Sequence, residues 1–364
     1  MQPPPTTTTS AVSGSRADPT GSRIECILIV LSFAAFLFSL QYRYQTANDN
    51  PLSPGTSDGA RVPDTWRLGV GEERARVAIV GCGGAGCNVL RRVAAPPNAT
   101  RIAVNDTVHP SMAEVSTRVL VAAGSLQAYA SMDEKAVPNM ETDEEKQISA
   151  SLLDRDIVVM LGGLGGELGG WGMSLVGRVA RILGDASVAF ATVPFTIEGP
   201  IRRQLAEAQL RLLQKRADGV VTFSNDRLLQ FARDLPLTKA FAALGAIMAR
   251  PAAELGAVLT RSDVVPLRRT LAGVREWRFG MGAGREKHRC FVAVEEAYSS
   301  PWFTSLPEEI SHAIVLMSVP EPDKDEIEIL QEIRRRSPHA VIAWASLPSV
   351  ATDDRTIVQV LAGI

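Results

Sequence analysis

Short apolar runs alternate with amphipathic segments along residues 76–233 of the chain. Apolar runs bounded by glycine or polar residues are typical of strands buried on both faces of a sheet, and segments with helical spacing are typical of the crossovers between parallel strands. The strand-like runs are residues 76–80, 101–106, 155–161, 187–195 and 219–224, and the helix-like segments are residues 87–94, 172–184, 202–217 and 226–233. The alternation predicts an α/β fold, a doubly wound domain with a parallel sheet.

A second, smaller α/β layer is predicted beyond a long apolar helix. Residues 238–258 have the length and composition of a helix that joins two halves, and Pro251 is expected to kink or interrupt it. The segments of the second layer are residues 288–300, 312–319, 325–337, 339–347 and 356–364. We therefore expect an α/β domain at 76–237, a central helix at 238–260 and a C-terminal domain at 261–364.

The residues before this region divide into three segments. Residues 1–23 are rich in Pro, Thr and Ser and are expected to be disordered, and residues 43–75 are expected to be a polar linker. Between them lies the charge-free run 26–40, which at about 1.5 Å per residue falls short of a ~30 Å hydrocarbon core unless flanking residues extend it. The favoured interpretation is a membrane-anchoring helix at 24–42; a signal-peptide-like segment and an extension without importance are the alternatives.

Composition narrows the class of partner. Of the 364 residues, 46% are hydrophobic and 21% charged, and the net charge of −2 offers no broad attraction to nucleic acid, which is therefore not an expected partner. The cysteines are scattered, which suits neither a disulfide framework nor a paired-cysteine metal site, so a reducing compartment is expected. The histidines are also dispersed and are expected to be ordinary surface or core residues.

Two glycine-rich stretches carry the candidate chemistry. The stretch 81–86, GCGGAG, lies between a predicted strand and a helix start, where close-packed amides and the helix N-terminus favour phosphate. Alone it fits several nucleotide folds and dinucleotide binders. The second stretch, 160–172, has seven glycines in thirteen residues after another strand and carries Glu167 in its middle. Together they suggest a triphosphate held from both sides; tight strand-to-helix packing is the alternative.

Several motifs, in order and spacing, resemble the tubulin/FtsZ superfamily, closest to FtsZ of prokaryotic cell division. The resemblance covers residues 76–364 and rests on VAIVGCGGAGCNVL, IAVND, VMLGGLGGELGGWG, VPFTIEGPIRR, VTFSNDRLL, FGMGAG, VEEAYSSPWF and IVQVLAGI. It implies a GTP-binding domain at 76–237, a central helix and a smaller C-terminal domain, assembling head to tail into filaments.

The resemblance also implies which residues contact the nucleotide. Two loops grip the phosphates through backbone amides: Gly81, Cys82, Gly83, Gly84, Ala85 and Asn88 in the first, and Gly162, Gly165, Gly166, Glu167, Gly169 and Gly170 in the second. Asn105 lies near the phosphates and Mg²⁺, Glu198 and Arg202 lie around the ribose and phosphates, Asn225 reads the guanine edge, and Phe241 stacks on the base. No residue is assigned as a metal ligand.

Each side chain also has an ordinary structural interpretation. Glu198 and Arg202 are four residues apart, and a surface pair at that spacing is worth only ~0.3–0.5 kcal/mol. Asn225 could cap the helix that follows it by accepting a backbone N–H. Phe241 could be part of the core.

The chain departs from the family pattern where chemistry is expected. Glu167 and Leu168 replace a Thr and a Gly of the signature loop, which places a carboxylate near phosphate and a Leu at a position expected to need positive φ. Residues 124–143 lack the usual glycine-rich loop over the γ-phosphate. Gly245 and Ala246 replace a guanine-reading Asp, so base selection is weakened.

The acidic loop that serves hydrolysis in the family, NxDxxD, is represented here by RSDVVP. Arg261 replaces its Asn and Pro266 its second acid, and only Asp263 is kept, as a weak catalytic base. We therefore expect slow hydrolysis of GTP, or none.

The leading hypothesis is an FtsZ-like GTP-binding filament protein for cell division or membrane remodelling. Its cytoplasmic domain would be tethered to the inner face of the membrane by residues 24–42, since the sequence ends at Ile364 without a C-terminal tail. The alternatives are an active GTPase in which Glu167 helps to hold Mg²⁺, and a non-hydrolysing modulator that binds true FtsZ. A dinucleotide oxidoreductase is a distant fourth, because no hydride-site constellation is present.

Overall fold

The computed structural model describes residues 65–108, 110–122, 142–231, 236–274, 276–347 and 354–364, which lie within one compact unit, Ser53–Ile364. The predicted disordered segment 1–23, the anchor 24–42, most of the linker and most of the segment 124–143 lie outside the described residues.

One sheet runs through the described residues and is almost entirely parallel. Its strand order is β1-β10-β9-β11-β8-β7-β6-β5-β2-β3-β4, and β11 alone runs antiparallel, to both β8 and β9. The strands are β1 (Thr65–Arg67), β2 (Val77–Cys82), β3 (Ala99–Asn105), β4 (Thr117–Leu120), β5 (Ile157–Gly163), β6 (Ala186–Val193), β7 (Gly219–Ser224), β8 (Trp277–Gly284), β9 (His312–Ser318), β10 (Val341–Leu347) and β11 (Thr356–Gly363). The predicted doubly wound α/β architecture is confirmed.

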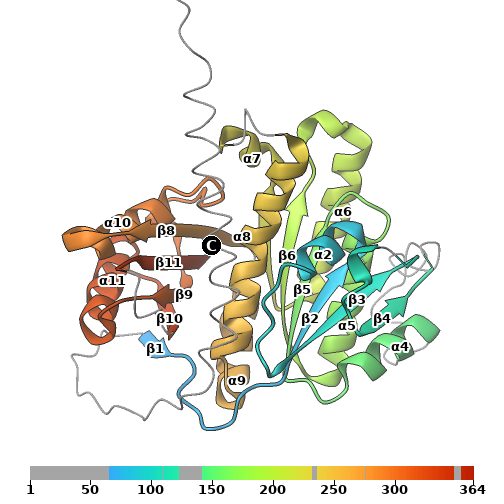
Figure 1. The fold of residues 1–364 in the computed structure, drawn as a ribbon, viewed down its shortest axis with the longest axis horizontal. Coiled ribbons are helices and arrows are strands. Elements are labelled where there is room, and N and C mark those ends of the chain that lie inside the picture. The colour runs from blue at the N-terminus through green and yellow to red at the C-terminus, as the bar shows by residue number, and fades with distance from the viewer. Residues whose placement is uncertain (1–64, 109, 123–141, 232–235, 275, 348–353) are drawn as a thin grey trace, which may run out of the picture. The chain divides into compact units, whose positions relative to one another are not determined.

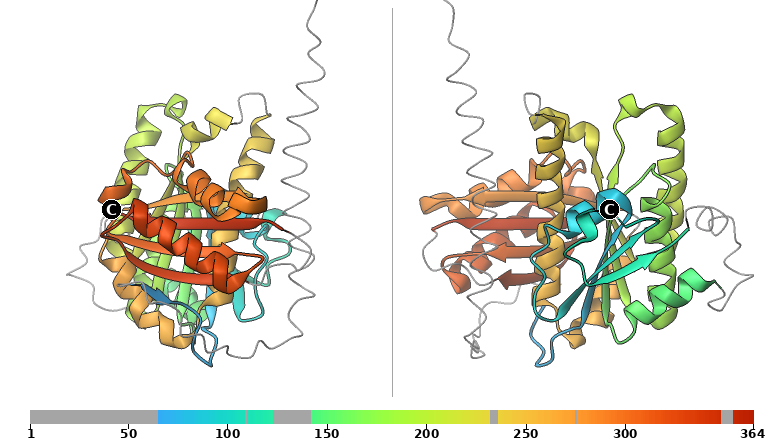
Figure 2. Two further views of the ribbon diagram at one scale, coloured as in Figure 1. Left: turned by 90° about the vertical axis from the view of Figure 1, so that its left-hand side faces the viewer. Right: turned by 45° about the vertical axis from the view of Figure 1, so that its right-hand side comes forward.

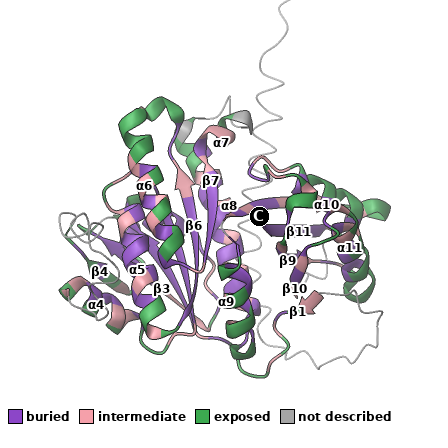
Figure 3. Ribbon diagram, turned by 180° about the vertical axis from the view of Figure 1, so that it is seen from behind, coloured by how far each residue is buried: buried purple, intermediate pink, exposed green. Residues whose placement is uncertain are grey.

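Helices cover both faces of this sheet. They are α2 (Gly83–Leu90), α4 (Asp143–Leu152), α5 (Gly169–Leu183), α6 (Pro200–Arg216), α7 (Asn225–Phe231), α8 (Leu237–Val258), α9 (Val264–Ala272), α10 (Arg289–Tyr298) and α11 (Pro322–Arg336). Successive residues of β2 enter opposite cores: Val77 and Ile79 pack on the side of α2 and α8, and Ala78 and Val80 on the side of α4, α5 and α6. Figure 3 shows these central strands buried and the outer helix faces exposed.

Helix α8 lies between the two halves of the fold (Figure 1). It contributes Leu244, Met248 and Leu255 to the core that both halves share. Pro251 lies inside it, and the helix continues to Val258, so the expected interruption does not occur. By length and hydropathy α8 is apolar enough to cross a membrane, but half of its apolar window is buried inside the fold, as in the core helix of a globular protein.

The C-terminal elements extend the same sheet, a join that the sequence did not predict. A single register pair, Val221 with Trp277, connects β7 to β8. Aromatic packing reinforces this connection between β7 and β8. The ring centre of Phe223 lies 5.4 Å from that of Phe279 and 5.9 Å from that of Trp302. Within the sheet, the halves are therefore joined by one ladder pair and a cluster of rings, in addition to the core that they share around α8.

The linker prediction for residues 43–75 is wrong over residues 65–75. Thr65–Arg67 form strand β1, which pairs in parallel with β10 at the edge of the sheet, in blue in Figure 2. Leu68 is buried, and its amide donates to the Trp344 carbonyl. Folded structure is therefore present already at residue 65, before the predicted boundary at 76, because an edge strand needs only a few alternating residues and Trp66 supplies apolar packing.

Acidic residues lie at the amino ends of the central strands. Asp156, just before β5, accepts hydrogen bonds from the backbone N–H of Arg76 at 2.7 Å and from Arg76 Nε at 3.3 Å. Asp185, just before β6, is 6% exposed, and its Oδ2 has no hydrogen-bond partner among the described residues. Burial, and next the charge of Asp156, raise the pKa of Asp185 to about 7, against the pull of Arg268.

This raised pKa makes a testable link to stability. The folded state binds the Asp185 proton more tightly than the unfolded chain does, so the proton stabilises the fold at low pH, and this contribution is lost as the pH rises through about 7. The substitution Asp185→Asn removes the charge. It should raise the free energy of unfolding by about 2–3 kcal/mol more at pH 8 than at pH 5.

Urea unfolding of both proteins at the two pH values measures the difference. Asp154→Asn is the matched control, because that carboxylate is exposed and Asn also tolerates its φ of 60°. An equal effect of Asp185→Asn at both pH values would contradict the assignment.

Candidate functional site

The two glycine-rich turns meet at the carboxyl edge of the sheet. Strands β2 and β5 are parallel neighbours, so the turns that follow them emerge side by side. A Cβ placed on Gly83 would lie 3.0 Å from the Gly169 amide nitrogen and 3.4 Å from the Leu168 Cβ. Helices α2 and α5 therefore begin at almost the same point.

Neither of these helix starts has a side-chain cap. The N-cap residues are Cys82 and Leu168, neither makes a side-chain hydrogen bond to its helix, and the first turns contain no acidic residue. The first amides of a helix need acceptors, and the helix field favours an anion there. Two uncapped N-termini that converge form a natural site for phosphate oxygens.

The glycines of the two turns divide into packed and open positions. A Cβ on Gly86 would overlap the Leu161 carbonyl oxygen, and a Cβ on Gly169 would overlap that of Gly163. By contrast, a Cβ on Gly84 or Gly166 would meet no atom within 4 Å. The packing interpretation thus holds for some of the glycines, whereas others leave backbone open to a ligand.

The exposed face of α2 is small and uncharged. Gly84, Ala85 and Asn88 are exposed, and the cysteines on the other side are buried. Burial raises the pKa of Cys82 well above its ordinary value and that of Cys87 to about 11. Both thiols therefore remain neutral and add no negative charge behind the turn.

Gln209 shapes the second turn and was missed in the sequence. Its side chain, fully buried on α6, accepts from the Gly165 amide at 2.7 Å and donates to the Gly166 carbonyl at 2.7 Å. These two bonds hold the turn in which Gly165 takes a φ of 79°. The only signal was a polar residue on the buried face of a helix, between Ala206 and Leu213.

The two unusual residues of this turn differ in their placement. Glu167 is exposed, so its carboxylate is directed to the surface and not into the core. Leu168 has φ −109° and ψ −40°, so the expected strain is absent and that prediction is wrong. The left-handed position of the turn is Gly165, three residues earlier.

Asn105, Glu198 and Arg202 are held by local contacts. Asn105 is buried at the end of β3, and its Nδ2 donates to the Thr107 carbonyl at 2.9 Å. Glu198 accepts from the Phe195 amide at 2.7 Å and pairs with Arg202 Nε at 3.0 Å. The ion pair that the spacing suggested therefore forms, across the junction between Thr196–Glu198 and α6.

Asn225 and Phe241 do not follow their ordinary interpretations. Asn225 is 6% exposed and begins α7, yet its Oδ1 accepts from no group among the described residues, so it does not cap the helix by that atom. Phe241 is 42% exposed and packs edge-on against Phe195, with ring centres 5.6 Å apart, so it is not a core residue. A buried acceptor and an exposed ring are thus left available near the start of α8.

One turn further along α8, Gly245 faces a cation. A Cβ on Gly245 would lie 3.4 Å from Arg92 Cδ and 3.5 Å from Arg92 Nε. Burial, and then the neighbouring Arg91, lower the pKa of Arg92. In the stretch Gly245–Ala246, where the resemblance leads us to expect an acid, Gly245 therefore carries no side chain and borders a guanidinium.

Asp263 lies at the opposite end of α8. A helix of 22 residues is about 33 Å long, so the chain does not bring Asp263 to its own glycine turns. Asp263 is 5% exposed, and its Oδ2 accepts from the Gly69 amide at 2.9 Å, the Thr260 amide at 2.8 Å and Thr260 Oγ1 at 2.6 Å. Within one chain this carboxylate therefore organises its own loop.

Arg261 and Pro266, on either side of Asp263, also serve structure. Arg261 pairs with Glu73 at 2.9 Å and with Asp156 at 3.4 Å. Pro266 lies in the first turn of α9, and its carbonyl accepts from Thr270 Oγ1.

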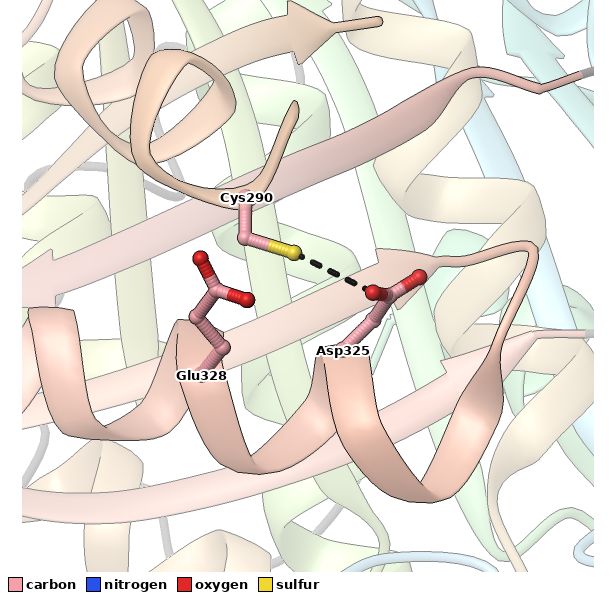
Figure 4. Close-up of side chains that lie close together, drawn as sticks. All are labelled: Cys290, Asp325 and Glu328. Atoms are coloured by element: carbon pink, nitrogen blue, oxygen red, sulfur yellow. Dashed lines mark hydrogen bonds between the residues drawn. The ribbon is translucent and has the colours of Figure 1, made fainter. Parts of the chain in front are cut away.

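A second cluster of possible ligands lies far from these turns in sequence. Cys290, Asp325 and Glu328 have ligand atoms within 4.8 Å of one another (Figure 4). However, Arg289 already binds Asp325 through two bonds of 3.1 Å, and burial, then the Asp325 charge, raise the Cys290 pKa to about 12. A metal ligand must be a thiolate, so we interpret the cluster as a tie between α10 and α11.

Comparison with known proteins agrees with this geometry. The model of the Tubulin/FtsZ family GTPase domain matches residues 76–233. Cell division protein FtsZ of Methanothermobacter thermautotrophicus is 32% identical over 241 residues, which are 63% of this chain and 62% of that protein, less than two thirds of its length. Cell division protein FtsZ 1 of Pyrococcus horikoshii is 28% identical over 282 residues, covering 74% and 76%.

Solved structures show the same fold. The empty FtsZ dimer of M. jannaschii matches with a TM-score of 0.67 and 22% identity, covering 80% of this chain and 88% of that one. GDP-bound CetZ1 of Haloferax volcanii matches with a TM-score of 0.61 and 16% identity, covering 79% and 94%. The motifs, the matched GTPase region and the fold agree, and together they support a divergent FtsZ-like protein of the tubulin/FtsZ superfamily.

Proposed function

We propose that this chain is an FtsZ-like GTP-binding filament protein of cell division or membrane remodelling that hydrolyses GTP slowly or not at all. The observation that carries the proposal is the convergence of two uncapped helix N-termini, where Gly83 lies against Gly169 and the neighbouring glycines Gly84 and Gly166 are open. These amides would hold the phosphates of the nucleotide.

The base would lie near the start of α8. The unpaired, buried Oδ1 of Asn225 would accept from an N–H group of guanine, and the exposed ring of Phe241 would stack on the base. Because Gly245 offers no carboxylate and borders Arg92, we propose that guanine is preferred less strongly than in a site with an acid there.

Slow or absent hydrolysis is supported by the state of the loop that follows α8. The Asp263 carboxylate accepts three hydrogen bonds within its own chain, and Arg261 is held by Glu73 and Asp156. Mg²⁺ would accompany the nucleotide phosphates, with Asn105 as the nearest family position. The alternative is an active GTPase in which Glu167 helps to hold Mg²⁺. The contacts that hold Asp263 and Arg261 within the chain do not favour GTP turnover.

Assembly is proposed from the relatives. The M. jannaschii structure is an FtsZ dimer, and CetZ2 of Haloferax volcanii is a protofilament bound to GTPγS. Separation of the glycine turns and Asp263 at opposite ends of α8 is compatible with head-to-tail stacking, in which one copy's loop faces the next copy's nucleotide. In the other alternative, a non-hydrolysing modulator would bind an FtsZ paralogue through the same two surfaces, at the glycine turns and at the loop that carries Asp263.

Nucleotide binding is tested by Gly84→Ala in the full-length chain. The methyl group meets no protein atom but would stand between the α2 amides and phosphate, so binding of a fluorescent GTP analogue should weaken about tenfold. Thermal stability should be unchanged or slightly higher. Phosphate release measured in the same Mg²⁺-containing samples should stay near the spontaneous rate in both proteins.

The control is Gly273→Ala at the end of α9, where φ is −72° and the nearest atom lies 3.4 Å from the Cβ. If Gly84→Ala bound the GTP analogue as strongly as the wild-type chain does, the proposed phosphate site at these turns would be wrong. Rapid phosphate release by the wild-type chain would support the active GTPase instead.

The role of Asn225 is tested by Asn225→Leu, which keeps the branched shape of the side chain and removes the unpaired acceptor. Stability should not fall, because a buried unsatisfied oxygen disappears, whereas GTP binding should weaken about tenfold or more and the preference for GTP over ATP should shrink.

Asn98→Leu is the matched control for this test. Asn98 donates to the carbonyls of Ala75 and Gly256, so its loss should lower stability by about 1–3 kcal/mol and leave binding unchanged. If Asn225→Leu loses stability and keeps its affinity, the amide is a structural group.

The membrane tether rests on the sequence alone and is tested by deletion of residues 24–42. The full chain should sediment with membranes and resist extraction by high salt, because a spanning helix is held by the hydrophobic effect. The deleted chain should be found in the soluble fraction. An unchanged distribution would reject the tether and leave the nucleotide site untouched.

A further inference from the structure

Residues 68–75 lie along the loop that joins α8 to α9, and we call them the strap. The loop, residues 259–263, carries Asp263. Both ends of the strap are fixed in the core, where Leu68 and Ala75 are buried. Between them the chain is mostly exposed, with Val70 72% accessible to solvent. The strap is thus a surface segment anchored at its two ends.

The backbone of the strap is bonded to the loop. Arg74 forms an antiparallel bridge with Thr260. The Ala75 amide donates to the Leu259 carbonyl at 3.1 Å, and the Arg261 amide donates to the Glu73 carbonyl at 2.9 Å. The loop therefore has a partner strand, formed by residues that the sequence suggested were a linker.

Side chains of the strap and the loop add further bonds. The Gly69 amide donates to Asp263 Oδ2 at 2.9 Å. Arg74 Nη1 donates to the carbonyls of Ala257 at 3.2 Å and Val258 at 2.9 Å, which are free carbonyls at the C-terminal end of α8 where a cation is favoured. The strap thus holds the helix end, the loop and the carboxylate together.

Two glycines allow this close approach. Gly69 has φ +79°, and a Cβ there would lie 2.6 Å from the Val258 carbonyl oxygen. A Cβ on Gly71 would lie 2.5 Å from Ser262 Oγ and 2.9 Å from Thr260 Oγ1. A side chain at either position would lift the strap away from the loop.

From these contacts we propose that the strap is an autoinhibitory restraint built into the fold. It fixes the loop within its own chain and withholds the Asp263 carboxylate from a nucleotide held by a second copy. This inference rests on the proposed function, and it makes the low hydrolysis a consequence of restraint as well as of the missing second acid. Loosening the strap removes the Gly69 bond to Asp263 and lets the loop move with the acid, which then keeps only its bonds from Thr260 within the loop.

The experiment uses the full-length chain with Gly69→Ala and, separately, Arg74→Ala. The first strains the backbone and crowds Val258, and the second removes two hydrogen bonds without steric change. Arg211→Ala, at an exposed position of α6, is the control. Hydrogen exchange of the Arg261 amide reports directly on the strap, because that amide donates to Glu73.

Both strap variants should exchange the Arg261 amide about tenfold faster than the wild-type chain and the control, because one or two hydrogen bonds are lost. With Mg²⁺ and GTP at concentrations that permit assembly, they should release phosphate several-fold faster. Adding Asp263→Asn should abolish that gain. GTP affinity of the dilute protein should not change, since the glycine turns lie at the other end of α8.

If the Arg261 amide exchanged at the wild-type rate in both variants, the proposed restraint would be wrong. Faster exchange with unchanged phosphate release, or a gain that survives Asp263→Asn, would overturn autoinhibition and leave the strap as a purely structural element. Failure of the proposed function is seen separately, as absence of GTP binding by the wild-type chain.

Discussion

Helices α2 and α5 start at one point because no side chain stands between them. The backbone of Gly83 lies against that of Gly169, Gly86 packs on the Leu161 carbonyl, and Gln209 holds the turn between β5 and α5 from behind. This close approach is a steric condition: a Cβ at the packed positions would push the two turns apart. The convergence of the two helix starts, and with it the proposed phosphate site, depends on that condition.

The long helix α8 then divides the chemistry between two distant places. Phe241 lies near its beginning, within reach of the region of the glycine turns, and Asp263 lies just beyond its end. Because a rigid helix of about 33 Å separates them, no side-chain rearrangement within one chain joins them. Any chemistry that needs both ends therefore needs two copies of the chain, and the contacts that hold each end within its own copy influence that chemistry from a distance.

The sequence predicted the repeating core of the fold well and its irregular parts poorly. Runs such as residues 155–161 are buried on both faces, and only a parallel sheet covered by helices satisfies such a run, so β5 and its neighbours were recognisable. Strand β1 has three residues and the strap has no apolar period, so no local pattern distinguished them from a linker. Gln209 bonds a turn 43 residues away, and Asp263 bonds Gly69, 194 residues away, and a local sequence pattern predicts neither contact. The left-handed residue of the second turn was expected at Leu168 but is Gly165, three residues earlier.

The seam between β7 and β8 has a mechanical consequence. One ladder pair, Val221 with Trp277, carries the continuity of the sheet, and the rings of Phe223, Phe279 and Trp302 fill the space beside it. Hydrogen-bonded ladders resist sliding because their bonds are directional, whereas packed rings tolerate small rotations with little loss of contact. Because so few directional bonds cross this seam, the angle between the two parts of the sheet is set mainly by the core that α8 shares with both halves.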